Sequence, residues 1–180
     1  MLETFAGFVR RVVRAFNRSG LHYMLTGALA SSYYGRPRTT LDVDVVVAVR
    51  QKDLPTLVKV LTKANLKVQE KRLQDAWQSE YRIATIEDRK SPHTLDIIFT
   101  DQKIERNAGR ILGLPTYYQS AESLILAKLI MLKVTLRAER AATDREDIKA
   151  ILETVQISMK TLRRRARAES TVKILDDLIS

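Results

Sequence analysis

The stretch TGALASSYYGRPRTTLDVDVVV, residues Thr26–Val47, decides the fold. It contains a glycine before a run of small residues, a basic turn, and two aspartates one residue apart before a run of valines. Side chains alternate along a β-strand, so Asp42 and Asp44 project from one face with Cα atoms about 6.6 Å apart. The intervening valines project from the opposite, buried face. Taken alone, such a pair is more often structural than metal-binding, so the rest of the chain must decide.

Working outward from this stretch, apolar periodicity and turn residues predict alternating helices and strands. The expected helices, with small residues or one apolar face, cover Leu2–Asn17, Ala28–Tyr34 and Asp53–Ala64. The expected strands cover Leu21–Thr26, Leu41–Val49, a short Leu66–Gln69, and the two arms of a hairpin, Glu80–Glu87 and His93–Thr100. Residues Gly109–Tyr118 are expected to form a loop and an edge strand.

From residue 120 onward the pattern is helical to the end of the chain. The expected helices are Ser120–Ala141, Asp144–Gln156 and Ser158–Ile179. We therefore predict an α+β fold, in which a mixed β-sheet flanked by helices occupies residues 1–118 and a helical segment occupies 119–180.

Composition narrows the class of protein. The net charge of +10 favours polyanionic partners such as RNA, DNA or nucleotides, or an acidic protein. The absence of cysteine excludes disulfides, thiol catalysis and Cys-based zinc sites, and two histidines make a His-rich metal site a poor expectation. No apolar run approaches the roughly 20 residues that a membrane span needs, and arginines interrupt the N-terminal apolar stretch. We expect a cytoplasmic protein without a membrane association.

A third aspartate changes the interpretation of the first two. Asp96, in HTLDIIF, is also a single acid inside an apolar run. If its strand pairs beside Leu41–Val49, three carboxylates share one face of the sheet. They would repel one another unless cations neutralise them. The arrangement therefore favours bound Mg²⁺, which prefers carboxylate oxygens.

The glycine turn supplies a complementary anion site. A strand ending at Thr26, followed by Gly27 and a helix from Ala28, places backbone N–H groups at a helix N-terminus, where phosphate binds well. An ordinary strand–helix turn would look the same in isolation. Together, a triphosphate at the helix and metal on Asp42 and Asp44 would form one site.

These residues resemble the DNA polymerase β-type nucleotidyltransferases, which carry a glycine turn, a short helix, Asp-x-Asp on the next strand and a third Asp on a later strand. Gly27-Ala28, Asp42-Val43-Asp44 and Asp96 follow that order. Within the superfamily, the stretch looks most like the AbiEii-type toxins, with Tyr-Gly-x-x-Arg-x-Thr-x-Asp-x-Asp spacing. The downstream run SLILAKLIMLKVTLRAERAATDREDIKAIL, with Lys128, Asp144 and Asp147, is similar to their C-terminal motif.

The resemblance implies roles for individual residues. Asp42, Asp44 and Asp96 would be catalytic and would ligate two Mg²⁺ ions, for which Mn²⁺ can substitute. Gly27 and Ala28 would hold an NTP triphosphate through backbone N–H groups. The sequence departs from the family pattern at two positions. Ala28 stands where many members carry Ser or Gly, and Thr143 stands where the family's C-terminal motif has a lysine.

Basic side chains outside this core have two interpretations each. Lys128 would reach a phosphate oxygen, or be an ordinary helix lysine with its amine at the surface. Arg36 and Arg38 would contact nucleotide or acceptor, belong to a solvated turn, or form a structural pair with Asp42. Asp144 and Asp147 are expected to cap a helix start. The basic run 160–167 would bind an RNA backbone or be a solvated face, and its arginines are Arg163, Arg164, Arg165 and Arg167.

Two functions from different classes follow. The first is a Mg²⁺-dependent nucleotidyltransferase that moves a nucleoside monophosphate from an NTP to an acceptor hydroxyl, with tRNA or other RNA as the expected acceptor and a toxin role, with an antitoxin partner, as a corollary. The second is a weak or inactive protein of the same fold that binds nucleotide, RNA or an acidic partner protein. Ala28 and Thr143 favour the second, and the three aspartates favour the first.

Overall fold

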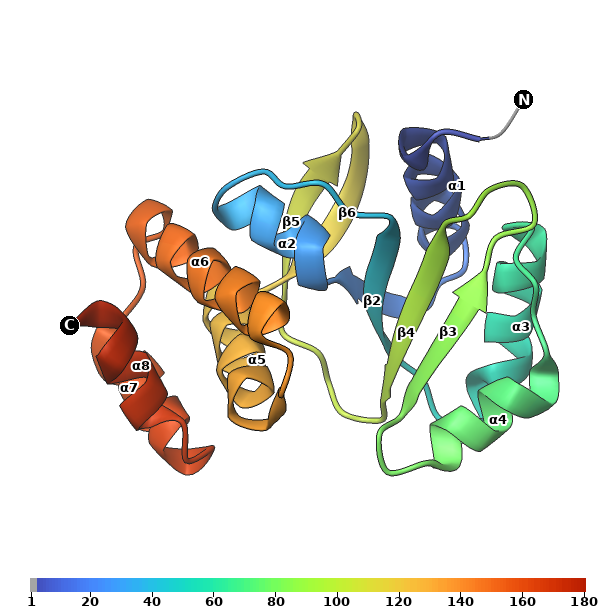
Figure 1. Cartoon of the computed structure of the whole chain (residues 1–180). Helices are drawn as coiled ribbons and strands as arrows, with labels where there is room; N and C mark the ends of the chain where they lie inside the picture. Colours follow the sequence, from blue (N-terminus) through green and yellow to red (C-terminus); the bar gives the residue numbers. More distant parts are fainter. Residues whose placement is uncertain (1–2) are drawn as a thin grey trace. The chain divides into compact units, whose positions relative to one another are not determined.

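The computed structural model describes residues 3–180, which form an α+β fold that contains a six-stranded mixed sheet and eight α-helices (Figure 1). The chain divides into two compact units, one of residues 1–29 and 39–119 and the other of residues 30–38 and 120–180. No helix within the described range is both long and apolar enough to cross a membrane.

The first unit contains the whole sheet, whose strand order is β3-β4-β2-β1-β6-β5. The strands are β1 (His22–Leu25), β2 (Asp42–Ala48), β3 (Ile83–Glu87), β4 (Thr94–Thr100), β5 (Arg106–Ile111) and β6 (Leu114–Gln119). β2 runs antiparallel to β1 and parallel to β4, and β3 pairs antiparallel with β4. This confirms the predicted hairpin and the predicted pairing of the two aspartate-bearing strands.

Helices of the first unit cover the apolar face of this sheet. They are α1 (Phe5–Asn17), the 3₁₀ turn η1 (Gln51–Asp53), α3 (Leu54–Lys63) and α4 (Glu70–Gln78). The register Leu25–Val45–Ile97 runs across three strands with every side chain fully buried. The ring of Phe16 in α1 packs 5.0 Å from that of Tyr23, which places α1 on the same face. The opposite face is therefore the one that carries the aspartates.

The second unit is helical. It contains most of α2 (Gly27–Tyr34), whose first residues belong to the first unit, followed by α5 (Ala121–Val134), α6 (Ala138–Thr154), α7 (Met159–Ala168) and α8 (Val172–Ile179). Gly35 ends α2 where an added Cβ would lie 3.1 Å from the Cβ of Ala150 in α6, so the small residue permits close packing.

Several predicted element boundaries were wrong. The expected loop and edge strand at 109–118 form a hairpin of the edge strand β5 with β6, so a second strand replaces most of the loop, and the expected strand 66–69 is a single bridge between Leu66 and Asp88. Helix α4 was not predicted, and the predicted final helix is two helices, α7 and α8. The expected start of the first helix, Leu2, lies outside the described residues.

Candidate active site

Asp44 and Asp96 lie next to each other on one face of the sheet. Asp44 of β2 and Asp96 of β4 are direct partners in the parallel ladder, so their side chains leave the same face side by side. Like charges placed directly opposite on a sheet destabilise it. Among residues 3–180, the buried Oδ1 of Asp96 accepts no hydrogen bond. An uncompensated carboxylate oxygen beside a second carboxylate is a position where a cation would be stabilising.

Asp42 is held differently. It is exposed, and its Oδ1 accepts a 2.7 Å hydrogen bond from the hydroxyl of Thr94, its partner in the ladder. The predicted structural pair with Arg36 or Arg38 does not form. Thr94 was missed by the sequence analysis, although strand alternation places it on the face of Asp96, two residues away.

The donor set fits a divalent cation in part. Carboxylate oxygens are the ligands that Mg²⁺ prefers, and the Asp44–Asp96 pair with the free oxygen of Asp96 supplies them. Within the described chain, however, no three His, Cys, Asp or Glu side chains are grouped closely enough to hold a metal ion. Asp42 would join the pair as a third ligand if its carboxylate left Thr94.

The backbone of Gly27 lies directly against the side chain of Asp44. Its φ of +57° is in the left-handed region, and a Cβ built on it would lie 2.1 Å from Oδ2 of Asp44 and 2.6 Å from Cγ. No side chain fits there, so the backbone at the start of α2 lies directly against the Asp44 carboxylate. The backbone N–H of Thr26 also donates a 3.0 Å hydrogen bond to the carbonyl of Asp44.

This contact explains why the turn contains glycine. The first N–H groups of an α-helix have no acceptor within the helix and favour anions. Ala28, the second residue of α2, has a buried methyl group, 5% exposed, so the residue offers a ligand its backbone and not its side chain. An anion site beside a cation site is the arrangement that binds a metal-complexed phosphate.

The second unit contains a buried ionic cluster that gathers residues singled out in the sequence. The Nζ of Lys128 in α5 donates a 2.7 Å hydrogen bond to Oδ1 of Asp144 and lies 2.8 Å from Oδ2 of Asp147. All three residues are less than 8% exposed. Arg38 adds a second cation, with Nε 3.4 Å from Oδ2 of Asp147. The ammonium of Lys128 is thus held by two carboxylates and does not reach the surface.

Two expectations about this region were wrong. Asp144 and Asp147 do not cap a helix start, because α6 begins six residues earlier at Ala138 and its N-cap, Arg137, makes no side-chain cap. The alternative of a lysine with a surface amine also fails, since Lys128 is buried. Arg36 pairs with Glu146 at 2.9 Å. Nucleotide binding by Arg38 and Lys128 stays a prediction.

The arginines of α7 are partly committed to neighbours in the second unit. Arg163 pairs with Asp176 of α8 at 2.9 Å, and Arg165 donates a 3.0 Å hydrogen bond to Ser123 of α5. Arg164 and Arg167 are exposed, and within residues 3–180 neither forms an ion pair. The predicted nucleic-acid surface is therefore reduced to two unpaired arginines on this helix, together with Lys160.

Comparison with known proteins places the fold. No family model and no curated protein matches the chain. Among solved structures, the antibiotic-resistance factor ANT(2'')-Ia in solution is similar over 100% of both chains, with a TM-score of 0.63 and 16% identity. The same factor in complex with adenylyl-2''-tobramycin matches 93% of this chain and 98% of its own, with a TM-score of 0.68 and 14% identity.

A third similar structure is an antigenic nucleotidyltransferase-like protein from Paracoccidioides brasiliensis. It covers 95% of this chain and 90% of its own, with a TM-score of 0.59 and 15% identity. The chain therefore has the nucleotidyltransferase fold, as predicted.

Proposed function

We propose that this protein is a Mg²⁺-dependent nucleotidyltransferase that transfers a nucleoside monophosphate from an NTP to an acceptor hydroxyl. The observation that carries the proposal is the contact of Gly27, at the start of α2, with Asp44, which is itself in direct register with Asp96. One place on the sheet thus combines an anion-binding backbone with paired carboxylates.

Each residue has a defined task in the proposed reaction. Asp44 and Asp96, joined by Asp42, would hold two Mg²⁺ ions, which supply charge neutralisation for the phosphates. The N–H groups of Gly27 and Ala28 would orient the triphosphate. The acceptor oxygen forms a bond to the α-phosphorus, the bond from that phosphorus to the β-phosphate oxygen breaks, and pyrophosphate leaves. Asp96 takes the proton of the acceptor hydroxyl.

The acceptor we favour is tRNA or another RNA, because the net charge of +10 attracts polyanions. The solved neighbour with adenylyl-2''-tobramycin makes a small-molecule hydroxyl the acceptor to compare against it. A toxin role with an antitoxin partner would follow from modification of tRNA in cells.

The test is transfer of label from α-³²P-labelled NTPs, each supplied with Mg²⁺, to tRNA, to an aminoglycoside or to protein. Asp44→Asn and Asp96→Asn are expected to lower transfer by at least about 100-fold, since each removes a charge that positions the reacting phosphate. Asp75→Asn provides the control, because Asp75 is an exposed acid on α4 without an ion pair among residues 3–180. Transfer that Asp44→Asn leaves unchanged would refute the assignment of the site.

The second candidate function is nucleotide binding without turnover. It is favoured by the hydrogen bond that ties Asp42 to Thr94 and by the absence of a three-carboxylate group in the described residues. Calorimetric binding of Mg²⁺-NTP without label transfer to any acceptor class would select this candidate. Thr94→Val separates the two, because freeing Asp42 should raise Mg²⁺ affinity if the carboxylates act together.

A further inference from the structure

A second charged feature of the first unit lies between α1 and α3. The two helices enclose a hollow of about 730 Å³. Half of its twelve lining residues are cations, and the only acid is Glu3. The six cations are Arg10, Arg11, Arg14, Arg18, Lys59 and Lys63. We name this feature the α1–α3 groove.

The groove is separate from the candidate active site. α1 packs on the sheet face that carries Tyr23 and the buried valines of β2, whereas Asp44 and Asp96 project from the opposite face. A ligand of the groove therefore does not contact the carboxylates through the same side of the sheet, and its binding can be tested without any transfer reaction.

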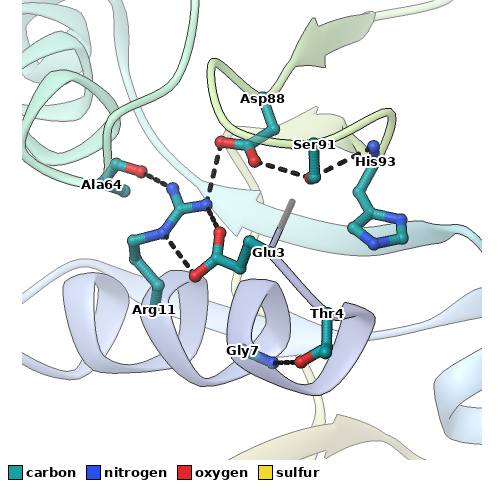
Figure 2. Close-up of polar contacts among 8 residues, drawn as sticks. All are labelled: Glu3, Thr4, Gly7, Arg11, Ala64, Asp88, Ser91 and His93. Carbon is teal, nitrogen blue, oxygen red and sulfur yellow. Dashed lines mark hydrogen bonds and ion pairs between the residues drawn. The ribbon is translucent and has the colours of Figure 1, made fainter. Parts of the chain in front are cut away.

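One of the six cations has a structural role. Arg11 donates hydrogen bonds to Glu3, to the carbonyl of Ala64 and, at 2.9 Å, to Asp88, whose other oxygen accepts from Ser91 (Figure 2). Burial alone would raise the pKa of Asp88, but hydrogen bonds from Ser91 and Arg11 and the charge of Arg11 outweigh it and hold that pKa below its usual range. Arg11 thus fastens α1 to the end of α3 and to the β3–β4 turn.

The other five cations have no carboxylate partner. Within residues 3–180, none of them forms an ion pair, and the one acid of the groove is already bound to Arg11. Like charges at i and i+4 on a helix destabilise it, and this pattern occurs twice on α1 and once on α3. The fold carries this uncompensated charge on two adjacent helices, where an anionic ligand would neutralise it.

The spacing of the cations suits a linear polyanion. Arg10 and Arg14 stand on successive turns of α1, and Arg18 is its C-cap residue with a helical backbone, so the three span about 12 Å at about 6 Å intervals. Lys59 and Lys63 stand one turn apart on α3, at the same interval. A strand with one phosphate per nucleotide can meet a cation at each step, whereas a single small anion would use only one or two.

The remaining lining is small or aliphatic, including Gly7, Ala15 and Val60. Among residues 3–180, the lining presents no aromatic side chain for stacking on bases and no large exposed apolar side chain for insertion into a membrane. Recognition would therefore be of the backbone charge and not of the base sequence.

We propose that the α1–α3 groove binds the phosphodiester backbone of a single-stranded nucleic acid, independently of sequence. The proposal goes beyond the transfer reaction and holds whether or not the carboxylates are catalytic. Five contacts predict that the logarithm of the binding constant falls with the logarithm of salt with a slope of about −3.5.

The test is fluorescence-anisotropy binding of a labelled 15-nucleotide RNA, and of DNA of the same sequence, to the full chain at several salt concentrations. The groove variant is R10Q/R14Q/K59Q. Losing three phosphate contacts should reduce the slope by about 2 and weaken binding about 100-fold in 0.1 M salt, since each contact is worth about fivefold there. The loss should appear with both nucleic acids, and the tighter one identifies the natural ligand.

The matched control is R140Q/R145Q/K149Q on α6, which removes the same net charge from exposed cations of the second unit. It should change affinity by less than about threefold. Equal losses in both variants, or no loss in the groove variant with a native circular dichroism spectrum, would overturn the proposal. So would binding of poly-glutamate with the same affinity and the same dependence on the groove. The binding assay contains neither NTP nor Mg²⁺, so its result does not depend on whether the transfer reaction occurs.

Discussion

Substituting Gly27 by alanine tests the central contact of the candidate site. An alanine at φ +57° costs about 1–2 kcal/mol for the left-handed backbone. Its Cβ would also lie 2.1 Å from Oδ2 and 3.0 Å from Cβ of Asp44, so the contact cannot be relieved by rotating the carboxylate alone. Overpacking of this kind costs a further ~1–3 kcal/mol. The expected loss of unfolding free energy is therefore about 2–5 kcal/mol.

The chain provides a control that isolates the contact. Gly113 has φ +83° and nothing within 4 Å of a built Cβ. Gly113→Ala should therefore lower the unfolding free energy only by the cost of the left-handed backbone, without a clash. Urea unfolding followed by circular dichroism measures both variants. In an Asp44→Ala background, Gly27→Ala should cost at least about 1 kcal/mol less, because the carboxylate it displaces is absent. Equal costs for Gly27→Ala and Gly113→Ala, or strict additivity with Asp44→Ala, would refute the contact.

Three further substitutions have outcomes that the structure predicts. Asp96→Asn should raise the unfolding free energy in metal-free buffer by up to about 1 kcal/mol, because it removes a like charge beside Asp44, and the gain should shrink as Mg²⁺ is added. Arg11→Met should lower the unfolding free energy by about 3–5 kcal/mol at pH 7, because it leaves the fully buried Asp88 carboxylate without its cation. Since the pKa of Asp88 is lowered in the fold, wild-type stability should fall as pH drops below the ordinary value of 3.8, and this acid sensitivity should flatten in the variant. Lys128→Met should cost a similar ~3–5 kcal/mol in urea unfolding, because two buried carboxylates lose their cation, and a variant as stable as Lys133→Met would contradict the cluster.

The strands with strong apolar signals were predictable from the sequence. β2 is a valine run and β4 is an apolar run around Asp96, with Leu95, Ile97 and Phe99 buried, so both strands could be predicted, and their pairing was a condition that the structure meets. The juxtaposition of Asp44 and Asp96 followed from that pairing. The contact of Gly27 with Asp44 could not be inferred, because it depends on a backbone angle and a distance that no spacing rule encodes.

The elements that were missed lack the usual signals. α4 has nine mostly polar residues and fully buries only Leu73, so its apolar face is small and its sequence gives a weak signal. The β5–β6 turn places Leu112 at φ +49° beside Gly113, and leucine is not a residue that marks such a turn. Pro115 inside β6 also argues against a strand, although it fits here beside an edge strand. Ser170 separates α7 from α8 at φ +55° without a glycine.

The parallel pairing of β2 with β4 has a consequence for how the chain folds. Asp42 and Thr94, which are hydrogen-bonded, are 52 positions apart, and α3, α4 and β3 lie between them in the chain. Closing so long a loop loses conformational entropy before the strand contacts contribute any stabilising free energy. Pairings between distant segments therefore form slowly. Until β2 pairs with β4, Asp44 and Asp96 are separated by the intervening chain and do not repel each other. The two carboxylates come together only when β2 pairs with β4. The same pairing brings together the buried apolar side chains on the other face of the sheet, and their burial offsets the charge repulsion.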